Sequence, residues 1–132
     1  MGEHESSKSS KSSKSSVWKF LPFSLDVVAV EGDSMEPTFR RGDWLLVRRL
    51  TPSFDPQRIQ LGDVLLIERE LQPGAVVIKR LKEIRGDSPN RHYKSYWVEG
   101  DNSLYSQDSR AWGAVMGIEI VGKVLFRVRR AS

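Results

Sequence analysis

The chain of 132 residues contains no cysteine, so it can form neither a disulfide framework nor a metal site built on thiolates. Its two histidines, His4 and His92, lie in polar stretches with no evident aspartate partner, which argues against a Ser-His-Asp site. No run approaches the roughly 18 to 20 apolar residues that cross a bilayer, and the best stretch, residues 17–30, is interrupted by charges and a proline. We therefore expect no transmembrane helix, and a protein that is cytoplasmic or peripherally attached to a membrane.

Positive and negative charges nearly balance, because the formal net charge is only +4 and it is spread among many acidic residues. No dense basic block is present, so the charge pattern does not indicate a nucleic-acid partner. The length is sufficient for about one domain that buries a core without covalent staples.

The first 23 residues differ in composition from the rest of the chain. Residues 6–16 read SSKSSKSSKSS, so we expect residues 1–16 to be a disordered tail, since nothing there offsets the entropy of ordering. Residues 17–23, VWKFLPF, are rich in aromatic and aliphatic side chains. They either pack onto the body or contact a membrane surface at headgroup depth. We expect residues 17–132 to form a single domain.

From residue 25 onward, short runs rich in Val, Ile, Leu, Trp and Tyr alternate with turn signals. The runs are residues 26–32, 43–50, 63–70, 75–84, 93–100 and 120–130. The dipeptide Gly-Asp, a turn signal, recurs at their edges, at residues 42–43, 62–63, 86–87 and 100–101. This spacing predicts a mainly β fold, a coiled antiparallel sheet or barrel with few short helices.

Ser34 is the first candidate for chemistry. It stands in GDSMEPT, where Gly32 follows an apolar run and allows a tight turn that leaves the serine exposed on a kink. A serine near a glycine is most often only part of a turn, so the motif alone does not establish a nucleophile. A serine hydroxyl also needs an adjacent base, and neither histidine is suitable.

Lys79 is the alternative base. Strand alternation places Val77, Lys79 and Leu81 on one face, and Ile78 and Arg80 on the other. If the first face is the core face, the amine loses water, its pKa falls, and it can accept a proton from a serine. The opposing interpretation is a lysine whose stem packs while its ammonium reaches solvent. The residue pattern alone does not exclude it.

Five segments, in order, resemble the conserved boxes of the type I signal peptidase family, a family of Ser-Lys dyad serine proteases (S26). They are GDSMEPTF, GDWLLVRR, LGDVLLIE, VIKRLKEIRGD and GDNSLYSQDSRAWGAV. A lone GDSM occurs in other Ser-Lys proteases and in many turns, whereas five boxes in order are specific. The resemblance covers about residues 27–125 and implies the β fold of a signal-peptidase catalytic core.

The resemblance implies a role for each matching residue. Ser34 matches the nucleophile, and its backbone N–H matches part of the oxyanion hole. Lys79 matches the general base. Ser106 matches a hydroxyl that orients the lysine amine, and Asp108 and Arg110 match a pair that supports the site. The alternative for that pair is an ordinary surface salt bridge of little energetic weight.

The sequence departs from the family in three respects. The second oxyanion donor, often a hydroxyl two residues before the nucleophile, is replaced by Gly32, and the sequence does not say what substitutes for it. We see no membrane anchor, and only residues 88–99 separate the last two boxes. This compact form, with the wording GDSMEPTF…GDWLLVRR, most resembles the branch of proteases that mature nickel-type superoxide dismutase.

The function that these observations predict is that of a serine endopeptidase cleaving an N-terminal signal or pro-peptide from a precursor polypeptide. No metal or other cofactor is required. The substrate would add a strand between residues 27–31 and 76–81, against Val28, Val30 and Ile78. Two alternatives are a self-cleaving repressor-type Ser-Lys protease and a non-catalytic peptide-binding β-barrel. The self-cleaving type needs an Ala-Gly or Cys-Gly bond, which this sequence lacks.

Overall fold

The computed structural model describes residues 24–50, 59–87 and 93–132. In these parts of the chain, seven strands form one antiparallel sheet with the order β1-β2-β7-β3-β4-β5-β6. The strands are β1 (Leu25–Ala29), β2 (Trp44–Arg49), β3 (Val64–Glu68), β4 (Val76–Arg85), β5 (Ser95–Glu99), β6 (Val115–Met116) and β7 (Ile120–Arg129). The mainly β prediction is confirmed, as an open sheet rather than a closed barrel.

The helical elements of the described residues are short. They are the 3-10 helices η6 (Ser103–Tyr105) and η7 (Gly117–Glu119) and the α-helix α1 (Ser109–Trp112). Both η6 and α1 lie in the connection between β5 and β6, which is the last of the five sequence boxes. This segment is therefore mostly a loop with two helical turns.

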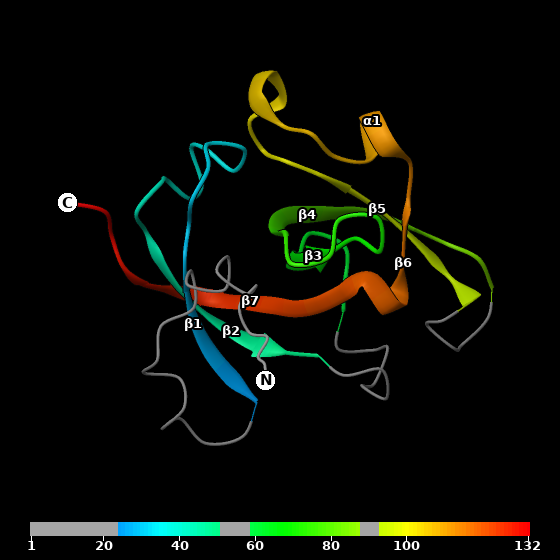
Figure 1. Ribbon diagram of the computed structural model, residues 1–132, viewed down its shortest axis with the longest axis horizontal. Coiled ribbons are helices and arrows are strands. Elements are labelled where there is room, and N and C mark those ends of the chain that lie inside the picture. The colour runs from blue at the N-terminus through cyan, green and yellow to red at the C-terminus, as the bar shows by residue number, and fades with distance from the viewer. Residues whose placement is uncertain (1–23, 51–58, 88–92) are drawn as a thin grey trace, which may run out of the picture.

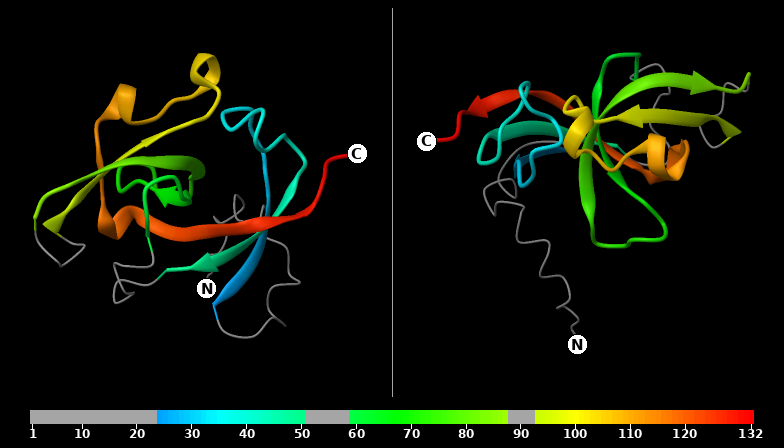
Figure 2. Two further views of the ribbon diagram at one scale, coloured as in Figure 1. Left: turned by 180° about the vertical axis from the view of Figure 1, so that it is seen from behind. Right: turned by 90° about the horizontal axis from the view of Figure 1, so that it is seen from above.

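The long strand β7 joins the two halves of the sheet. It pairs with β2 along one edge and with β3 along the other, so the β1–β2 hairpin and the β3–β4–β5 meander meet on it. Figure 1 shows β7 crossing the molecule from beneath β3 to the β1–β2 end. Figure 2 shows β1 and β2 at one end and β4 and β5 at the other.

The sheet carries a hydrophobic cluster on each face, because the central strand β3 is apolar in continuous sequence and is buried on both sides. Leu65 and Ile67 point into the larger cluster, and Leu66 points into the smaller one. The larger cluster contains Leu50, Ile59, Leu65, Ile67, Leu81, Tyr96, Val98, Val115 and Ile120. The smaller contains Val28, Val30, Leu45, Val47 and Leu66.

Two of the Gly-Asp pairs form turns of one design. Gly42 and Gly62 have φ of 94° and 93°, a conformation that glycine adopts without steric cost. The next residue, Asp43 or Asp63, accepts a hydrogen bond from the backbone N–H three residues before it, at 2.9 and 2.8 Å respectively. These turns end the loops that lead into β2 and β3, as the sequence predicted.

Residues 1–23 lie outside the described residues, so the predictions of a tail at 1–16 and a membrane contact at 17–23 have no structural outcome. The same holds for both histidines. Within the described segments, we find no helix with the length and apolar character needed to cross a bilayer.

Candidate active site

Ser34 lies in the turn that follows β1. The turn is closed by a hydrogen bond from the backbone N–H of Phe39 to the carbonyl oxygen of Met35, at 3.0 Å. Met35 is 1% exposed, so its side chain fixes the turn to the body of the protein. Ser34 itself is half-buried, and it lines a groove. The tight turn that the sequence predicts around Ser34 is therefore present as a hydrogen-bonded turn.

Lys79 is buried in strand β4, with 3% of its surface exposed. Val77 and Leu81, on the same side of the strand, pack in the larger cluster, as the alternation predicted. Burial lowers the pKa of Lys79. The negative charge of Asp108 raises this pKa and the positive charge of Arg110 lowers it, and the net result lies below the usual lysine value. The solvent-reaching alternative for Lys79 is excluded.

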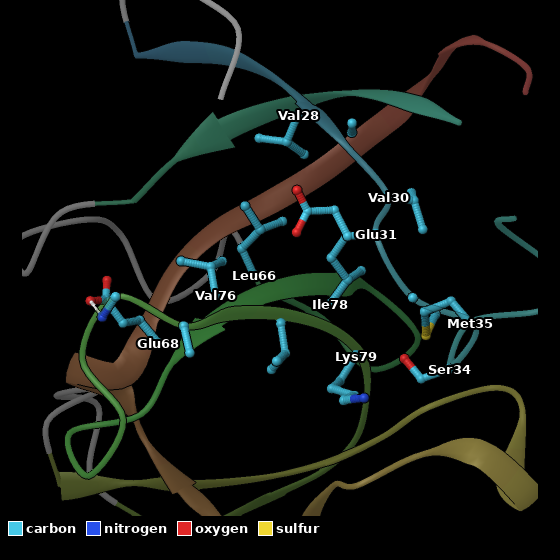
Figure 3. Close-up of a pocket in the computed structure, with 15 residues that line it drawn as sticks. Val28, Val30, Glu31, Ser34, Met35, Leu66, Glu68, Val76, Ile78 and Lys79 are labelled. Carbon is cyan, nitrogen blue, oxygen red and sulfur yellow. Dashed lines mark hydrogen bonds between the residues drawn. The ribbon is translucent and has the colours of Figure 1, made fainter. Parts of the chain in front are cut away.

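The amine of Lys79 faces the hydroxyl of Ser34 in a groove. Both Ser34 and Lys79 line it, and Figure 3 shows the Lys79 Nζ atom pointing toward the Ser34 hydroxyl. Away from these two residues, the walls are largely apolar and include Val28, Val30 and Ile78. The groove has a volume of about 540 Å³, enough for several residues of a peptide.

The groove lies between two strand edges that no described strand covers. β1 pairs with β2 alone. In β4, the segment Val76–Lys79 pairs with β3 on one side, and the pairing with β5 begins only at Arg80. Both edges therefore present backbone N–H and C=O groups toward the groove, where an extended peptide could pair with them.

Ser106 holds the amine of Lys79 from the side of the β5–β6 connection. The Nζ atom donates to Ser106 Oγ at 3.2 Å, and Ser106 Oγ donates to the Asp108 carboxylate at 2.6 Å. Because the hydroxyl proton is used on the carboxylate, the oxygen of Ser106 is left to accept from the lysine. The three side chains form one directed chain of hydrogen bonds.

Asp108 anchors this series of hydrogen bonds, because its carboxylate is held in place by several donors. Its side chain is fully buried, and its oxygens accept from Arg110 Nε at 3.0 Å, from the Arg110 terminal nitrogen at 2.6 Å and from the Gly100 N–H at 2.8 Å. Burial alone would raise the pKa of Asp108. The hydrogen bonds from Arg110, Ser106 and Gly100 outweigh that effect, so the pKa lies well below the usual range. The pair is therefore a buried carboxylate held by an arginine, and not a surface salt bridge.

The GDN sequence at residues 100–102 fastens the Ser34 turn to the same loop. The backbone N–H of Asn102 donates to the carbonyl oxygen of Ser34 at 2.8 Å, and its side-chain amide donates to the Asp33 carbonyl at 3.1 Å. Gly100 is packed so closely that a Cβ there would lie 2.6 Å from the Ser34 carbonyl oxygen and would overlap Ser106 Oγ. Glycine is required by this close approach.

A second contact ties the Ser34 turn to β4. Asp101 accepts two hydrogen bonds from Arg80, both of 2.8 Å, and one of 2.6 Å from the Thr38 hydroxyl. The hydrogen bond from Arg80 is the main reason why the pKa of Asp101 is lowered. Since Arg80 follows Lys79, this network fixes the position of the Ser34 turn relative to the part of β4 that carries Lys79.

Sequence reasoning assigned no role to Asn102, Asp101, Arg80 or Thr38. The Gly-Asp of GDN predicts a turn, and GDN opens the last family box, but neither observation gives these four side chains a role. Nothing in a single sequence links residue 38 to residue 101.

Gly32 lines the groove, and a Cβ there would meet no atom within 4 Å, so the space that a hydroxyl side chain would fill is open. Among the described residues, we find no cluster of three or more His, Cys, Asp or Glu side chains that could hold a metal ion.

The model of the peptidase S24-like family matches residues 4–125. The chain belongs to the peptidase S24-like family. It is 32% identical to mitochondrial inner membrane protease subunit 1 of Homo sapiens over 77% of this chain and 68% of that protein. It is 33% identical to the mitochondrial ATP-independent inner membrane protease subunit 1a of Arabidopsis thaliana, over 80% and 71%. It is 26% identical to mitochondrial inner membrane protease subunit 2 of Saccharomyces cerevisiae, over 75% and 65%.

These comparisons confirm the resemblance to signal-peptidase-like proteases that the five sequence boxes indicated. The chain is a peptidase of this family.

Proposed function

We propose that this peptidase is a serine endopeptidase that removes an N-terminal signal or pro-peptide with a Ser34–Lys79 dyad. One observation carries the proposal. A buried lysine, with its pKa lowered by burial, faces a serine hydroxyl at the end of a groove between two unpaired strand edges. Ordinary surface lysines are charged at neutral pH and cannot act as bases.

The first step forms an acyl-enzyme. Neutral Lys79 accepts the proton of the Ser34 hydroxyl while Oγ attacks the scissile carbonyl carbon. The tetrahedral intermediate then collapses, and the protonated Lys79 delivers that proton to the leaving amine. The amine product departs, Lys79 is neutral again, and the acyl group is bound to Ser34 as an ester.

The second step releases the acyl group. Lys79 accepts a proton from a water molecule as the water oxygen attacks the ester carbonyl. The protonated lysine returns the proton to Ser34 Oγ as the ester bond breaks. The carboxylic acid product leaves, and the enzyme is restored.

The backbone N–H of Ser34 is the donor that we propose for the oxyanion. The Ser34 turn is restrained through its carbonyl by the Asn102 N–H. A rigid donor stabilises developing charge without a reorganisation cost. Gly32 offers no hydroxyl, so the side chain that often supplies a second donor in the family is missing here.

The substrate binds as an added strand in the groove, between β1 and Val76–Lys79 of β4. The residues before the scissile bond then lie along Val28, Val30 and Ile78. By the family resemblance, a small side chain such as Ala precedes the cut. The free edges of β1 and β4 support this binding mode because they supply main-chain partners on both sides.

The precursor of a nickel-type superoxide dismutase is the specific substrate that we propose, because the sequences of the first two boxes most resemble those of the proteases that mature this enzyme.

We further propose that residues 17–132 form the catalytic domain, and that residues 17–23 make a peripheral membrane contact. The relatives that are named inner membrane proteases support a membrane setting for the substrate.

The test is to incubate the full chain with candidate precursors, including that of a nickel-type superoxide dismutase, and to sequence the new N-termini. We expect one defined cut after a small residue with the wild-type protein and no cut with Ser34→Ala. Binding without cleavage by the folded wild-type protein would instead support the non-catalytic peptide-binding alternative. Cleavage of this chain itself would support the self-cleaving alternative.

A further inference from the structure

Glu31 places a carboxylate in a groove that is otherwise largely apolar. It lies between Val30, the last buried residue after β1, and the Ser34 turn. Its side chain lines the groove, and Figure 3 shows the carboxylate directed inward, over the side of the groove where Val28 and Leu66 lie. A glutamate at this position is available to any peptide that occupies the groove.

Among the described side chains, none forms an ion pair with this carboxylate. Arg41 approaches only the backbone of Glu31. One of its terminal nitrogens donates to the Glu31 carbonyl oxygen at 2.8 Å, and the other pairs with the Asp33 carboxylate at 3.2 Å. Lys79 also lines the groove, but its amine donates to the Ser106 hydroxyl.

A second glutamate, Glu68, lies at the far end of the groove, but it is already engaged. Its carboxylate accepts from the backbone N–H of Gly74 at 2.8 Å, which holds the loop before β4. Its negative charge nevertheless adds to that of Glu31. The wall away from Lys79 is therefore made mostly of apolar side chains and carries the negative charges of two carboxylates.

We infer that Glu31 is a specificity-determining residue that selects a basic side chain in the substrate segment preceding the scissile bond. This inference rests on the proposed function for the direction of the substrate, and on the groove alone for the charge preference. A Lys or Arg side chain suits the site because its methylene stem covers apolar walls while its cationic end reaches the carboxylate. An acidic side chain at the same place would meet like charge.

The effect is one of binding rather than of chemistry. Glu31 precedes Ser34 by three residues and contacts no reacting group, so it stabilises the bound peptide and its transition state alike. Such uniform binding changes KM and leaves kcat nearly unchanged. Because the carboxylate is exposed to solvent, the preference weakens as salt is raised.

The test uses fluorescently labelled seven-residue peptides of alanine and valine that carry one Lys, Gln or Glu. That residue is placed in turn at the second to the sixth position before the carboxyl end. Their affinity for full-length Ser34→Ala protein is measured by anisotropy, so binding is read without turnover. At one or more positions, we expect Lys to bind more tightly than Glu by about threefold to tenfold, with Gln between them.

Three variants in the Ser34→Ala background decide whether Glu31 is responsible. Glu31→Gln should bring the Lys and Glu peptides within about twofold of each other, and Glu31→Lys should reverse their order. Glu70→Gln, at an exposed glutamate outside the groove, is the matched control and should leave the preference unchanged.

Equal affinity for the Lys and Glu peptides would overturn the inference, and so would a preference that survives in Glu31→Gln or the absence of any peptide binding. The result is separable from the proposed catalysis. A Glu31-dependent preference in a wild-type protein that cleaves no precursor would sustain the inference and contradict the Ser-Lys protease. Cleavage of a precursor without any charge preference in peptide binding would support the protease and contradict the role of Glu31.

Discussion

Lys79 Nζ donates to Ser106 Oγ at 3.2 Å, and the same oxygen donates to the Asp108 carboxylate at 2.6 Å. The direction of these hydrogen bonds matters, because a Ser106 hydroxyl that donates its only proton to Asp108 can accept from the lysine amine but cannot donate to its lone pair. The lone pair of a neutral Lys79 is then left for another hydroxyl. In the groove, the hydroxyl that it faces is that of Ser34.

The first prediction concerns Ser106. Packing fixes the stem of Lys79 but not its amine, so removal of the Ser106 hydroxyl leaves the amine free to turn away from Ser34. We expect Ser106→Ala to lower kcat by about tenfold or more, equal to about 1.4 kcal/mol, with a smaller change in KM. Steady-state kinetics on a cleaved peptide measures both.

Ser103→Ala, at an exposed serine of the same loop, is the matched control and should retain wild-type kinetics. If folded Ser106→Ala keeps a kcat within about twofold of the wild-type value, Ser106 is a turn residue and does not position the amine.

The second prediction is the pH dependence of activity. The base is the neutral form of Lys79, so the rate is low below the pKa of the folded enzyme and rises as the pH passes through it. Since burial lowers this pKa, kcat/KM should reach its plateau below the ordinary lysine value of 10.5. A profile of kcat/KM that shows no ionisation from neutrality to about pH 10 argues against a lysine base.

The third prediction uses the open space at Gly32. A Cβ there meets no atom within 4 Å, so Gly32→Ser and Gly32→Ala should both fold with thermal midpoints close to that of the wild-type protein. The serine adds a hydroxyl next to the proposed oxyanion position. We expect Gly32→Ser to raise kcat by about tenfold relative to Gly32→Ala. Equal rates for the two variants would show that a backbone group or water already supplies this donor.

The fourth prediction concerns residues 1–16. Their composition of serine, lysine and other polar residues cannot form a core, so a chain that begins at Val17 should cleave a soluble peptide at the wild-type rate. The match to the family model begins at residue 4, which makes the truncation informative. A large loss of kcat in the shortened protein would place part of this segment in the catalytic unit.

Much of the fold and the chemical centre could be predicted from local pattern. Strand alternation placed Lys79 on one face with Val77 and Leu81, because a strand reverses its side chains at every residue, but it left open whether that face is buried. Gly-Asp pairs identified the turns at residues 42–43 and 62–63, where a positive φ favours glycine. The role of Ser106 as the hydroxyl that orients the lysine amine came from the family resemblance, and in the structure its oxygen accepts a hydrogen bond from Nζ.

The contacts between loops could not be predicted, because they join residues far apart in the chain. The hydrogen bond between Thr38 and Asp101 spans 63 positions. No local periodicity encodes it. The need for glycine at position 100 likewise arises from its closeness to the Ser34 carbonyl, and not from its own backbone angles. The unpaired edges of the groove follow from where the β4–β5 pairing begins, which is a property of register.

The most direct test of the central claim is the rate of peptide cleavage by Ser34→Ala, Lys79→Ala and the double variant, each shown to be folded by its thermal unfolding. If the two residues act as one unit, each single variant should lose at least about a thousandfold in kcat, and the double variant should be no slower than either. Substantial turnover by folded Ser34→Ala, or losses that add in the double variant, would contradict the dyad.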